Sequence, residues 1–250
     1  ASWRRVAAGR RPQEAVNLTY HMNPYMTLAN KFFAEGNLAK TFFYRRLFED
    51  VQASFFGKDT YGYSIGLYVM GGMSGQQDWL WKQMQEVGDS ELGVVAFLSY
   101  LYAKGDYAGF LDARKSVPRD RGAVDFWLGL LETHALERLG RNGRAFEAMW
   151  RVMTNKTPMF EDQMFPLERH TLETAARVFD QAGQDYLALR LYRKLDRTCR
   201  LTEDVSWEAY RQQHIVQPLA RLESQVQETG PENDRGTGRP DTDCAELAPK

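Results

Sequence analysis

The sequence predicts an all-α protein, an α-solenoid of about five antiparallel helical hairpins closed by a C-terminal capping helix. Three observations predict this class. Through most of the 250 residues, apolar side chains recur three and four positions apart, which is the period of an α-helix. Single glycines stand where these helices would end. The period-two alternation of Ile, Val and Thr that marks strands is missing.

The glycines that mark the hairpins share a common setting. Two adjacent residues seven and eight positions before each glycine are apolar, and so is the residue four before it. The turn glycines predicted in this way are Gly36, Gly105, Gly143 and Gly183. They are 69, 38 and 40 residues apart. The first gap is two periods long, so one more hairpin is expected near residues 70–75.

That hairpin falls within residues 68–79, YVMGGMSGQQDW. With Gly75 as the turn glycine, the apolar pattern fits, except that Gly71 stands where the others have a large residue. The stretch also surrounds Ser74 with glycines, as a nucleophile elbow does. That motif needs glycines two before and two after the serine, and a preceding strand. Since neither condition holds, the glycines indicate helix termination and close helix packing.

The two ends of the chain differ from its body. Residues 1–20 form a basic arm, and the helical-repeat array is expected over residues 21–198. The capping helix is expected over residues 199–228, and Pro218 would kink or divide it. Residues 229–250 hold three prolines, three glycines and one large apolar side chain. This composition is typical of a flexible, acidic tail.

Aromatic residues are expected mainly between neighbouring repeats. Trp79 and Trp81 are two positions apart and so point to different faces of a helix, one in the core and one at the surface. Phe42, Phe43 and Tyr44 likewise cannot all be buried on one helix unless it is covered on two sides. Packing between repeats, or a partner protein, would cover the second face.

The hairpin around Gly183 resembles the tetratricopeptide repeat and its Sel1-like relatives. The consensus positions are carried by Leu172, Ala175, Ala176, Phe179, Ala188 and Tyr192. The resemblance covers roughly residues 25–195, with spacings that drift from the family's 34 residues. It implies a concave groove lined by the first helix of each hairpin. The partner-binding positions that it implies are Asn30, Phe33, Tyr102, Glu137, Arg141, His170, Glu173 and Arg177.

The resemblance implies a non-enzymatic protein–protein interaction scaffold. Such a chain would be an accessory or assembly subunit of a larger complex, for example one associated with a bacterial envelope. It would hold an extended peptide or a loop of another subunit. The alternative is a helical protein or enzyme that binds a small molecule, glycan or lipid in an aromatic-lined pocket. A third reading, nucleic-acid binding through the N-terminal arginines, is disfavoured because the net charge is only −1.

No motif in the sequence points to a metal or a cofactor, and none of either is expected. The histidines are not spaced as ligands on one helical turn, and there is no Cys-His cluster. His170 and Glu173 are three apart and share a helix face, where a surface hydrogen bond is favoured over an acid–base pair. No catalytic residue is therefore assigned.

The compartment depends on two observations. The start at Ala1 and the excess of arginine over lysine favour an exported product, periplasmic or membrane-associated, over a cytoplasmic one. Cys199 and Cys244 could form one disulfide or be two separate thiols. No apolar run reaches the length of a membrane span. Membrane association would come through the complex or through an anchor removed from the N-terminus.

Overall fold

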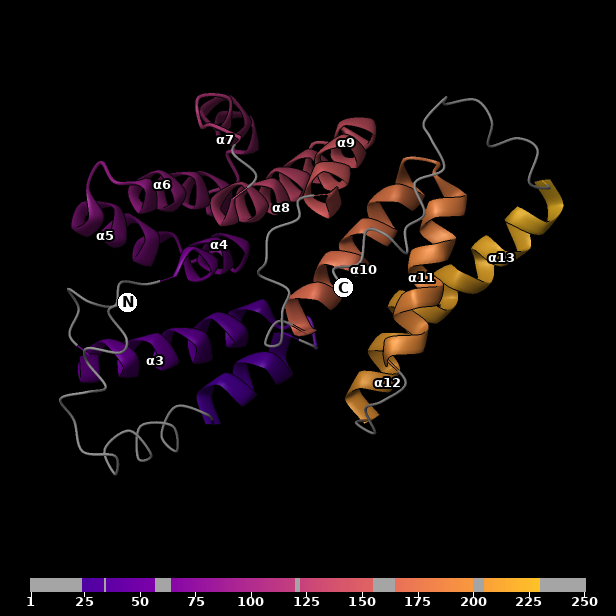
Figure 1. Cartoon of the computed structure of the whole chain (residues 1–250), viewed down its shortest axis with the longest axis horizontal. Coiled ribbons are helices and arrows are strands. Elements are labelled where there is room, and N and C mark those ends of the chain that lie inside the picture. The colour runs from indigo at the N-terminus through magenta and orange to yellow at the C-terminus, as the bar shows by residue number, and fades with distance from the viewer. Residues whose placement is uncertain are drawn as a thin grey trace. The chain divides into compact units, whose positions relative to one another are not determined.

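The computed structural model describes residues 24–33, 35–56, 64–119, 122–154, 165–199 and 205–229. Within these ranges the regular structure is helical and contains no strand, so the predicted all-α class is confirmed (Figure 1). None of the helices described is both long and apolar enough for a membrane span. The predicted basic arm, nearly all of the predicted tail and Cys244 lie outside the described residues. The disulfide therefore stays a prediction.

The chain divides into two compact units, residues 1–104 and 105–250. In the first unit, residues 24–33 are helical and precede α3 (Leu38–Phe56), α4 (Ile65–Met73), α5 (Gln77–Val87) and α6 (Glu91–Ala103). Helix α6 packs against both α4 and α5. Ser64 and Ser90 begin α4 and α6, because each hydroxyl accepts a backbone N–H of the first turn.

An aromatic cluster forms the core of the first unit. The ring of Trp79 lies 5.0 Å from that of Phe42 and 5.4 Å from that of Tyr68, measured between centroids. Trp81, two residues on, is 52% exposed. Phe43 is exposed in the same way beside buried Phe42. The prediction that neighbouring aromatics divide between core and surface is confirmed.

The glycines of α4 lie where other elements come close. A Cβ added at Gly71 would meet the Trp79 ring at 3.1 Å, and one at Gly72 would meet the carbonyl oxygen of Ser99 at 3.0 Å. Ser74 ends the helix, and its hydroxyl donates to a carbonyl of the preceding turn at 2.7 Å. The interpretation of these glycines as sites of helix termination and close packing is confirmed.

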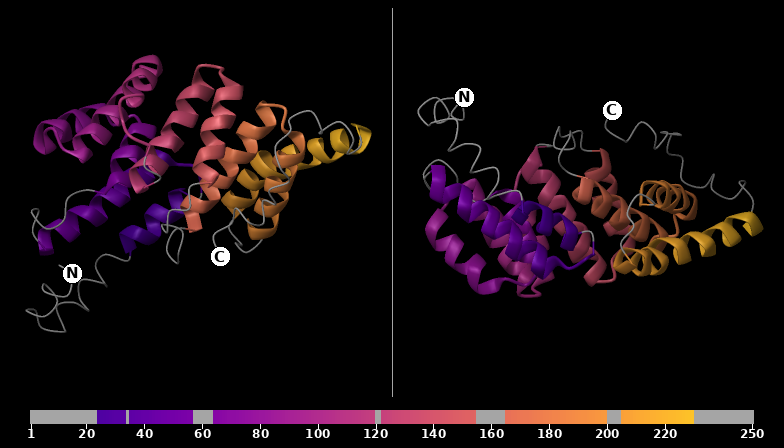
Figure 2. Two further views of the ribbon diagram at one scale, coloured as in Figure 1. Left: turned by 45° about the horizontal axis from the view of Figure 1, so that its top comes forward. Right: turned by 90° about the horizontal axis from the view of Figure 1, so that it is seen from below.

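The second unit contains α7 (Tyr107–Arg114), α8 (Ala123–Arg138), α9 (Asn142–Thr154), α10 (Phe165–Gln181), α11 (Asp185–Cys199), α12 (Val205–Arg211), the π-helical η2 (Gln212–Val216) and α13 (Gln217–Thr229). From α7 to α11 each helix packs against the next, and α13 returns onto α11 (Figures 1 and 2). The six residues that carry the family resemblance, from Leu172 to Tyr192, are all buried in this unit.

Six glycines with positive φ follow helices in the described ranges, and five of them share one turn geometry, Gly88 with a φ of 58° being the exception. These five have φ angles between 66° and 79°, and they are Gly36, Gly75, Gly105, Gly140 and Gly183. At all of these except Gly105, the glycine N–H donates to the carbonyl three residues back. The next N–H donates to the carbonyl five back, with all distances between 2.8 and 3.2 Å. This pair of bonds is a Schellman motif, in which glycine is favoured because it has no Cβ.

The prediction of Gly143 as a turn residue is wrong. Gly143 lies in the first turn of α9, and Gly140 makes the left-handed turn instead. The two glycines of LGRNG are three residues apart, so both fit a helical spacing and the pattern alone does not separate them. With the corrected register, the residue seven positions before each turn glycine is buried: Ala29, Tyr68, Leu98, Thr133 and Ala176.

In the segment where the capping helix is predicted, residues 199–228, the structure describes helix from Val205 onward, and it is not one regular α-helix. The π-helical η2 directly precedes α13, whose second residue is Pro218. A proline has no N–H to donate to the preceding turn, and a π-turn accommodates the changed bonding. Ile215 and Leu222 are buried on this segment.

Candidate functional site

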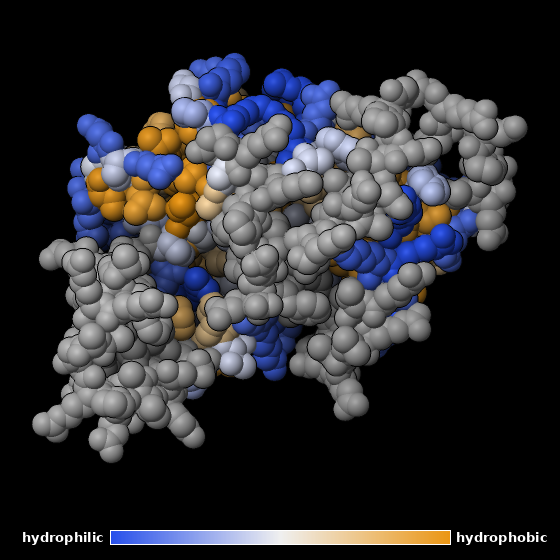
Figure 3. Space-filling view, viewed as in Figure 1, coloured by the Kyte–Doolittle hydropathy of each residue, from blue (hydrophilic) through white to orange (hydrophobic). Residues whose placement is uncertain are grey.

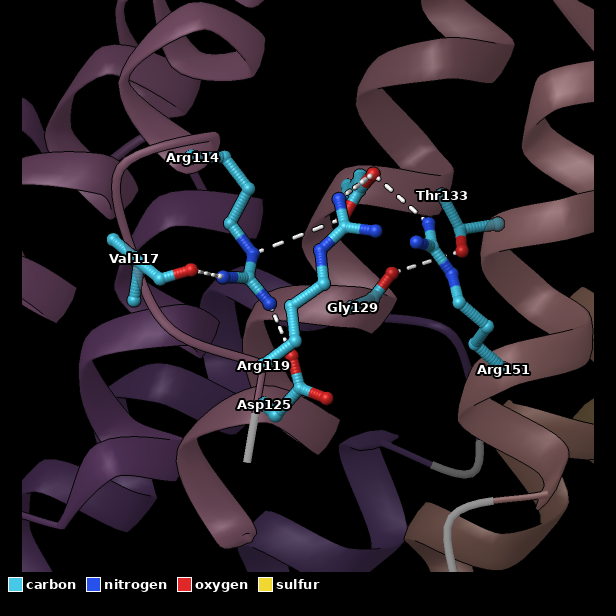
Figure 4. Close-up of polar contacts among 8 residues, drawn as sticks. Arg114, Val117, Arg119, Asp125, Gly129, Thr133 and Arg151 are labelled. Carbon is cyan, nitrogen blue, oxygen red and sulfur yellow. Dashed lines mark hydrogen bonds and ion pairs between the residues drawn. The ribbon is translucent and has the colours of Figure 1, made fainter. Parts of the chain in front are cut away.

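A cavity of about 300 Å³ lies among α7, α8 and α9 in the second unit. Its lining contains three arginines, two acids and several small or apolar residues. The ionised side chains sum to a charge of +1. Figure 4 shows Arg114 and Arg151 on opposite sides of this space, with Arg119 between them. We call this group the arginine pocket.

Arg114 is the buried anchor of the arginine pocket, with a side chain only 2% exposed. It forms an ion pair with Asp125 through Nη2 and donates from Nη1 to the carbonyl of Val117 at 3.1 Å. Its Nε lies 3.7 Å from a carboxylate oxygen of Glu132. A buried guanidinium is costly unless it is paired in this way. These contacts fix the end of α7, and the segment after it, against α8.

Glu132 is the acid on which the arginines converge. Its Oε1 accepts from Nη2 of Arg119 and from Nη2 of Arg151, both at 3.1 Å. Burial raises the pKa of Glu132, and this effect outweighs the lowering by Arg119 and Arg114. The ionised carboxylate therefore depends on its cationic neighbours.

Arg119 and Arg151 are the exposed members of the arginine pocket. Their side chains are 43% and 47% exposed, while Glu132 beneath them is buried. A guanidinium carries five N–H donors. The bonds to Glu132 run through Nη2 of each arginine. Both side chains thus have donors beyond those that hold the acid.

Sequence reasoning missed this pocket because of the register error at Gly143. With Gly140 as the turn, Glu132 and Thr133 stand eight and seven residues before it, where the other hairpins have mostly apolar residues. Thr133 satisfies its hydroxyl within the helix by donating to the carbonyl of Gly129 at 2.9 Å. The first glycine of LGRNG, Gly140, was the signal that could have revealed an acid at a core position.

Four of the predicted partner-binding residues gather in a second cluster, between α8 and α10. Arg177 forms a two-pronged ion pair with Glu137, at 3.0 and 3.1 Å. His134 Nδ1 lies 3.0 Å from Glu137 Oε2, and the His134 and His170 rings are 5.7 Å apart. Burial opposes the ionisation of Glu137, but hydrogen bonds from His134 and Arg177 prevail and lower its pKa to about 2.

Glu173 belongs to the same cluster and is buried rather than at a surface. It accepts a hydrogen bond from the hydroxyl of Tyr210 on α12. Tyr210 in turn stacks on His214, with ring centroids 4.3 Å apart. Glu173 thus joins α10 to the C-terminal segment. No group of three or more His, Cys, Asp or Glu in the described ranges is arranged to hold a metal ion.

The other predicted partner-binding residues lie apart from this cluster. Arg141 is exposed in the turn after α8. In the first unit Phe33 and Tyr102 are buried, and Asn30 is half-buried. Their role toward a partner stays a prediction, but two of them already contribute to the core.

An exposed apolar surface lies on α5 and α6 of the first unit. Trp81, Val94 and Phe97 are all exposed there, and the Trp81 ring is 5.6 Å from that of Tyr100. Figure 3 shows an orange, apolar area on this part of the first unit. We call it the α5–α6 face. It was not among the predicted partner-binding positions.

The described residues define an all-helical protein, several of whose helices end in glycine turns, with the arginine pocket in one unit and the exposed α5–α6 face in the other. No family model, no curated protein and no solved structure matches this chain. Its function is therefore argued from the residues themselves.

Proposed function

We propose that this chain is a non-enzymatic helical-repeat scaffold that binds another protein as an accessory or assembly subunit. The proposed architecture is an α-solenoid of about five antiparallel hairpins with α13 as part of its cap. Two features support this reading. The turn glycines recur at 36, 75, 105, 140 and 183, and the position seven residues before each is buried. Repetition of one turn and one buried position is typical of stacked helical hairpins.

The observation that carries the binding role is the α5–α6 face. Large apolar side chains that are exposed together on adjoining helices are typical of protein interaction sites, because removing them from water stabilises a complex. Trp81 is 52% exposed and Phe97 is 41% exposed. Tryptophan and other aromatic residues dominate the binding energy of interfaces. We propose this face as the main contact for an extended peptide or a loop of the partner.

A double variant tests the proposal. The full chain and Trp81→Ser/Phe97→Ser are used as bait in the native source under mild detergent. Tyr186→Ser serves as the matched control, since Tyr186 is a similarly exposed aromatic residue on α11. We expect a stoichiometric partner to be lost with the double variant and retained with the control. Equal recovery by all three baits, with unchanged helical content, would refute the α5–α6 face as the contact.

The scaffold function itself is tested by the unaltered full chain as bait in the same experiment. If the unaltered chain stays alone in every preparation, the subunit function is wrong. The alternative of a small-molecule binder would then be preferred. The arginine pocket is lined largely by charged side chains. It does not support the aromatic-lined pocket of that alternative.

A further inference from the structure

We propose that the arginine pocket is a binding site for a terminal phosphate group, held by Arg119 and Arg151. This inference goes beyond the scaffold function and does not depend on it, because the α5–α6 face belongs to the other unit. The ligand chemistry is that of a tetrahedral oxyanion, and its source is either free phosphate or a phosphomonoester.

The charges of the pocket leave a positive surplus at its exposed side. Arg114 is balanced by Asp125 through a direct ion pair. Glu132 is then shared by two further cations, Arg119 and Arg151. One carboxylate cannot neutralise both. A phosphate group, with a charge of about −1.5 to −2 at neutral pH, would more than offset this surplus of one positive charge.

The geometry of the donors suits an anion with several oxygens. Arg119 follows α7 and Arg151 belongs to α9, so the two side chains reach Glu132 from different elements, as Figure 4 shows for the arginines. Both are anchored on the same oxygen of a buried acid, which restricts their motion before any ligand arrives. Each guanidinium retains further N–H donors, and planar forks of this kind bind phosphate with two hydrogen bonds.

The pocket also has space that an internal ion-pair network does not need. Its volume of about 300 Å³ exceeds the roughly 30 Å³ of a single water many times over. Small residues at the lining, Gly129 and Ala148, help to leave this room. At Gly129 a Cβ would stand 2.8 Å from a methyl of Val152, so α8 and α9 approach closely beside the cavity.

Substitutions at Glu132 and at the two arginines should change the affinity for phosphate in opposite directions. The Glu132 carboxylate holds the arginines but also repels an incoming anion. Glu132→Gln keeps the shape and an acceptor oxygen while it removes the negative charge. We expect this variant to bind phosphate about 10-fold more tightly. We expect Arg119→Gln/Arg151→Gln to bind it at least about 10-fold more weakly, since it loses charged hydrogen bonds. A purely structural network predicts neither change.

The experiment is isothermal titration calorimetry of the full chain with inorganic phosphate, at fixed ionic strength set by chloride. Arg193→Gln is the matched control, because Arg193 is similarly exposed and pairs with Glu223 at 3.0 Å. Saturable binding with one site, strengthened by Glu132→Gln and unchanged by the control, would support the site. No saturable heat at millimolar phosphate, or an equal loss in the control, would overturn it.

Two further arms complete the test. Titration with O-phosphoserine separates the sources, since tighter binding of O-phosphoserine assigns a phosphomonoester and tighter binding of inorganic phosphate assigns the free ion. Thermal unfolding covers the case in which the arginine variant fails to fold. Phosphate should then raise the melting temperature of the unaltered chain, and more so that of Glu132→Gln. No rise in either protein would also overturn the proposal.

Discussion

The turn between α8 and α9 provides a pair of substitutions with opposite expected effects. Gly140 has a φ of 66°, in the left-handed region, and no heavy atom lies within 4 Å of the Cβ that alanine would add. The cost of Gly140→Ala therefore comes from the backbone alone. A left-handed residue with a Cβ costs about 1–2 kcal/mol, and the stiffer unfolded chain returns about 0.4–1 kcal/mol. The net expectation is a loss of about 1 kcal/mol.

Gly143 is the matched partner, three residues further on. It lies in α9 and likewise has no heavy atom within 4 Å of an added Cβ. Alanine is a better helix former than glycine by about 0.5–1 kcal/mol, with the smaller value suited to a first turn. Gly143→Ala should therefore stabilise the protein slightly. The two variants should differ by about 1.5 kcal/mol in the free energy of unfolding.

Urea unfolding followed by far-ultraviolet circular dichroism measures this difference directly. Gly105→Ala is a useful reference, because Gly105 also has a positive φ, of 79°, with open space around it. It should behave like Gly140→Ala. If Gly143→Ala loses stability while Gly140→Ala does not, the turn lies where the sequence pattern placed it. The corrected register, and the explanation of the missed pocket, would then be wrong.

Three further substitutions have defined expectations. The pKa of Glu137 is lowered from 4.5 to about 2, so its contribution to the free energy of unfolding is present above pH 4.5 and is lost as the pH falls toward 2. In urea titrations at several pH values, the unaltered chain should lose about 2–3 kcal/mol over this range, and Glu137→Gln should not show this loss. Gly72→Ala places a methyl 3.0 Å from the backbone oxygen of Ser99 and should cost about 1–3 kcal/mol in the same assay; an unchanged midpoint would contradict the close contact. Arg114→Met leaves Asp125 without its cation and should cost about 3 kcal/mol, part of which Asp125→Asn should recover in the double variant. A double variant no more stable than the single one would show that the pair is not coupled.

The helices and most of their turns could be predicted from the sequence, because both follow from local patterns. Periodic apolar residues and glycine fix where a helix ends, and this worked at Gly36, Gly75, Gly105 and Gly183. Glu137 and Arg177 were assigned to one groove with Gly143 as the turn glycine, which places both six residues before their glycines. The structure does pair them, although with Gly140 as the turn they stand three and six residues before their glycines.

The register error at Gly143 hid Glu132 as an acid at a core position, and the arginines around it could not be predicted, since their contacts are not periodic. Arg114 meets Asp125 over 11 residues, and Glu132 meets Arg151 over 19. A charged residue in a sequence is expected at the surface, and no local pattern reveals that Arg114 is buried. The α5–α6 face was missed for the converse reason. Apolar side chains such as Phe97 were assigned to packing between helices, and the structure leaves them exposed.

The π-helical segment η2 sets the rotation of α13 about its axis, so a deletion within η2 would reorient α13. A π-turn holds one residue more than an α-turn, so side chains before and after it are out of phase by about a hundred degrees. This offset helps to direct Glu223 of α13 toward Arg193 of α11 and to bury Leu222. Deleting any one residue from 212–216 would rotate α13 relative to α12 by about a hundred degrees and turn both residues away. The length of this segment is therefore more strictly constrained than its composition.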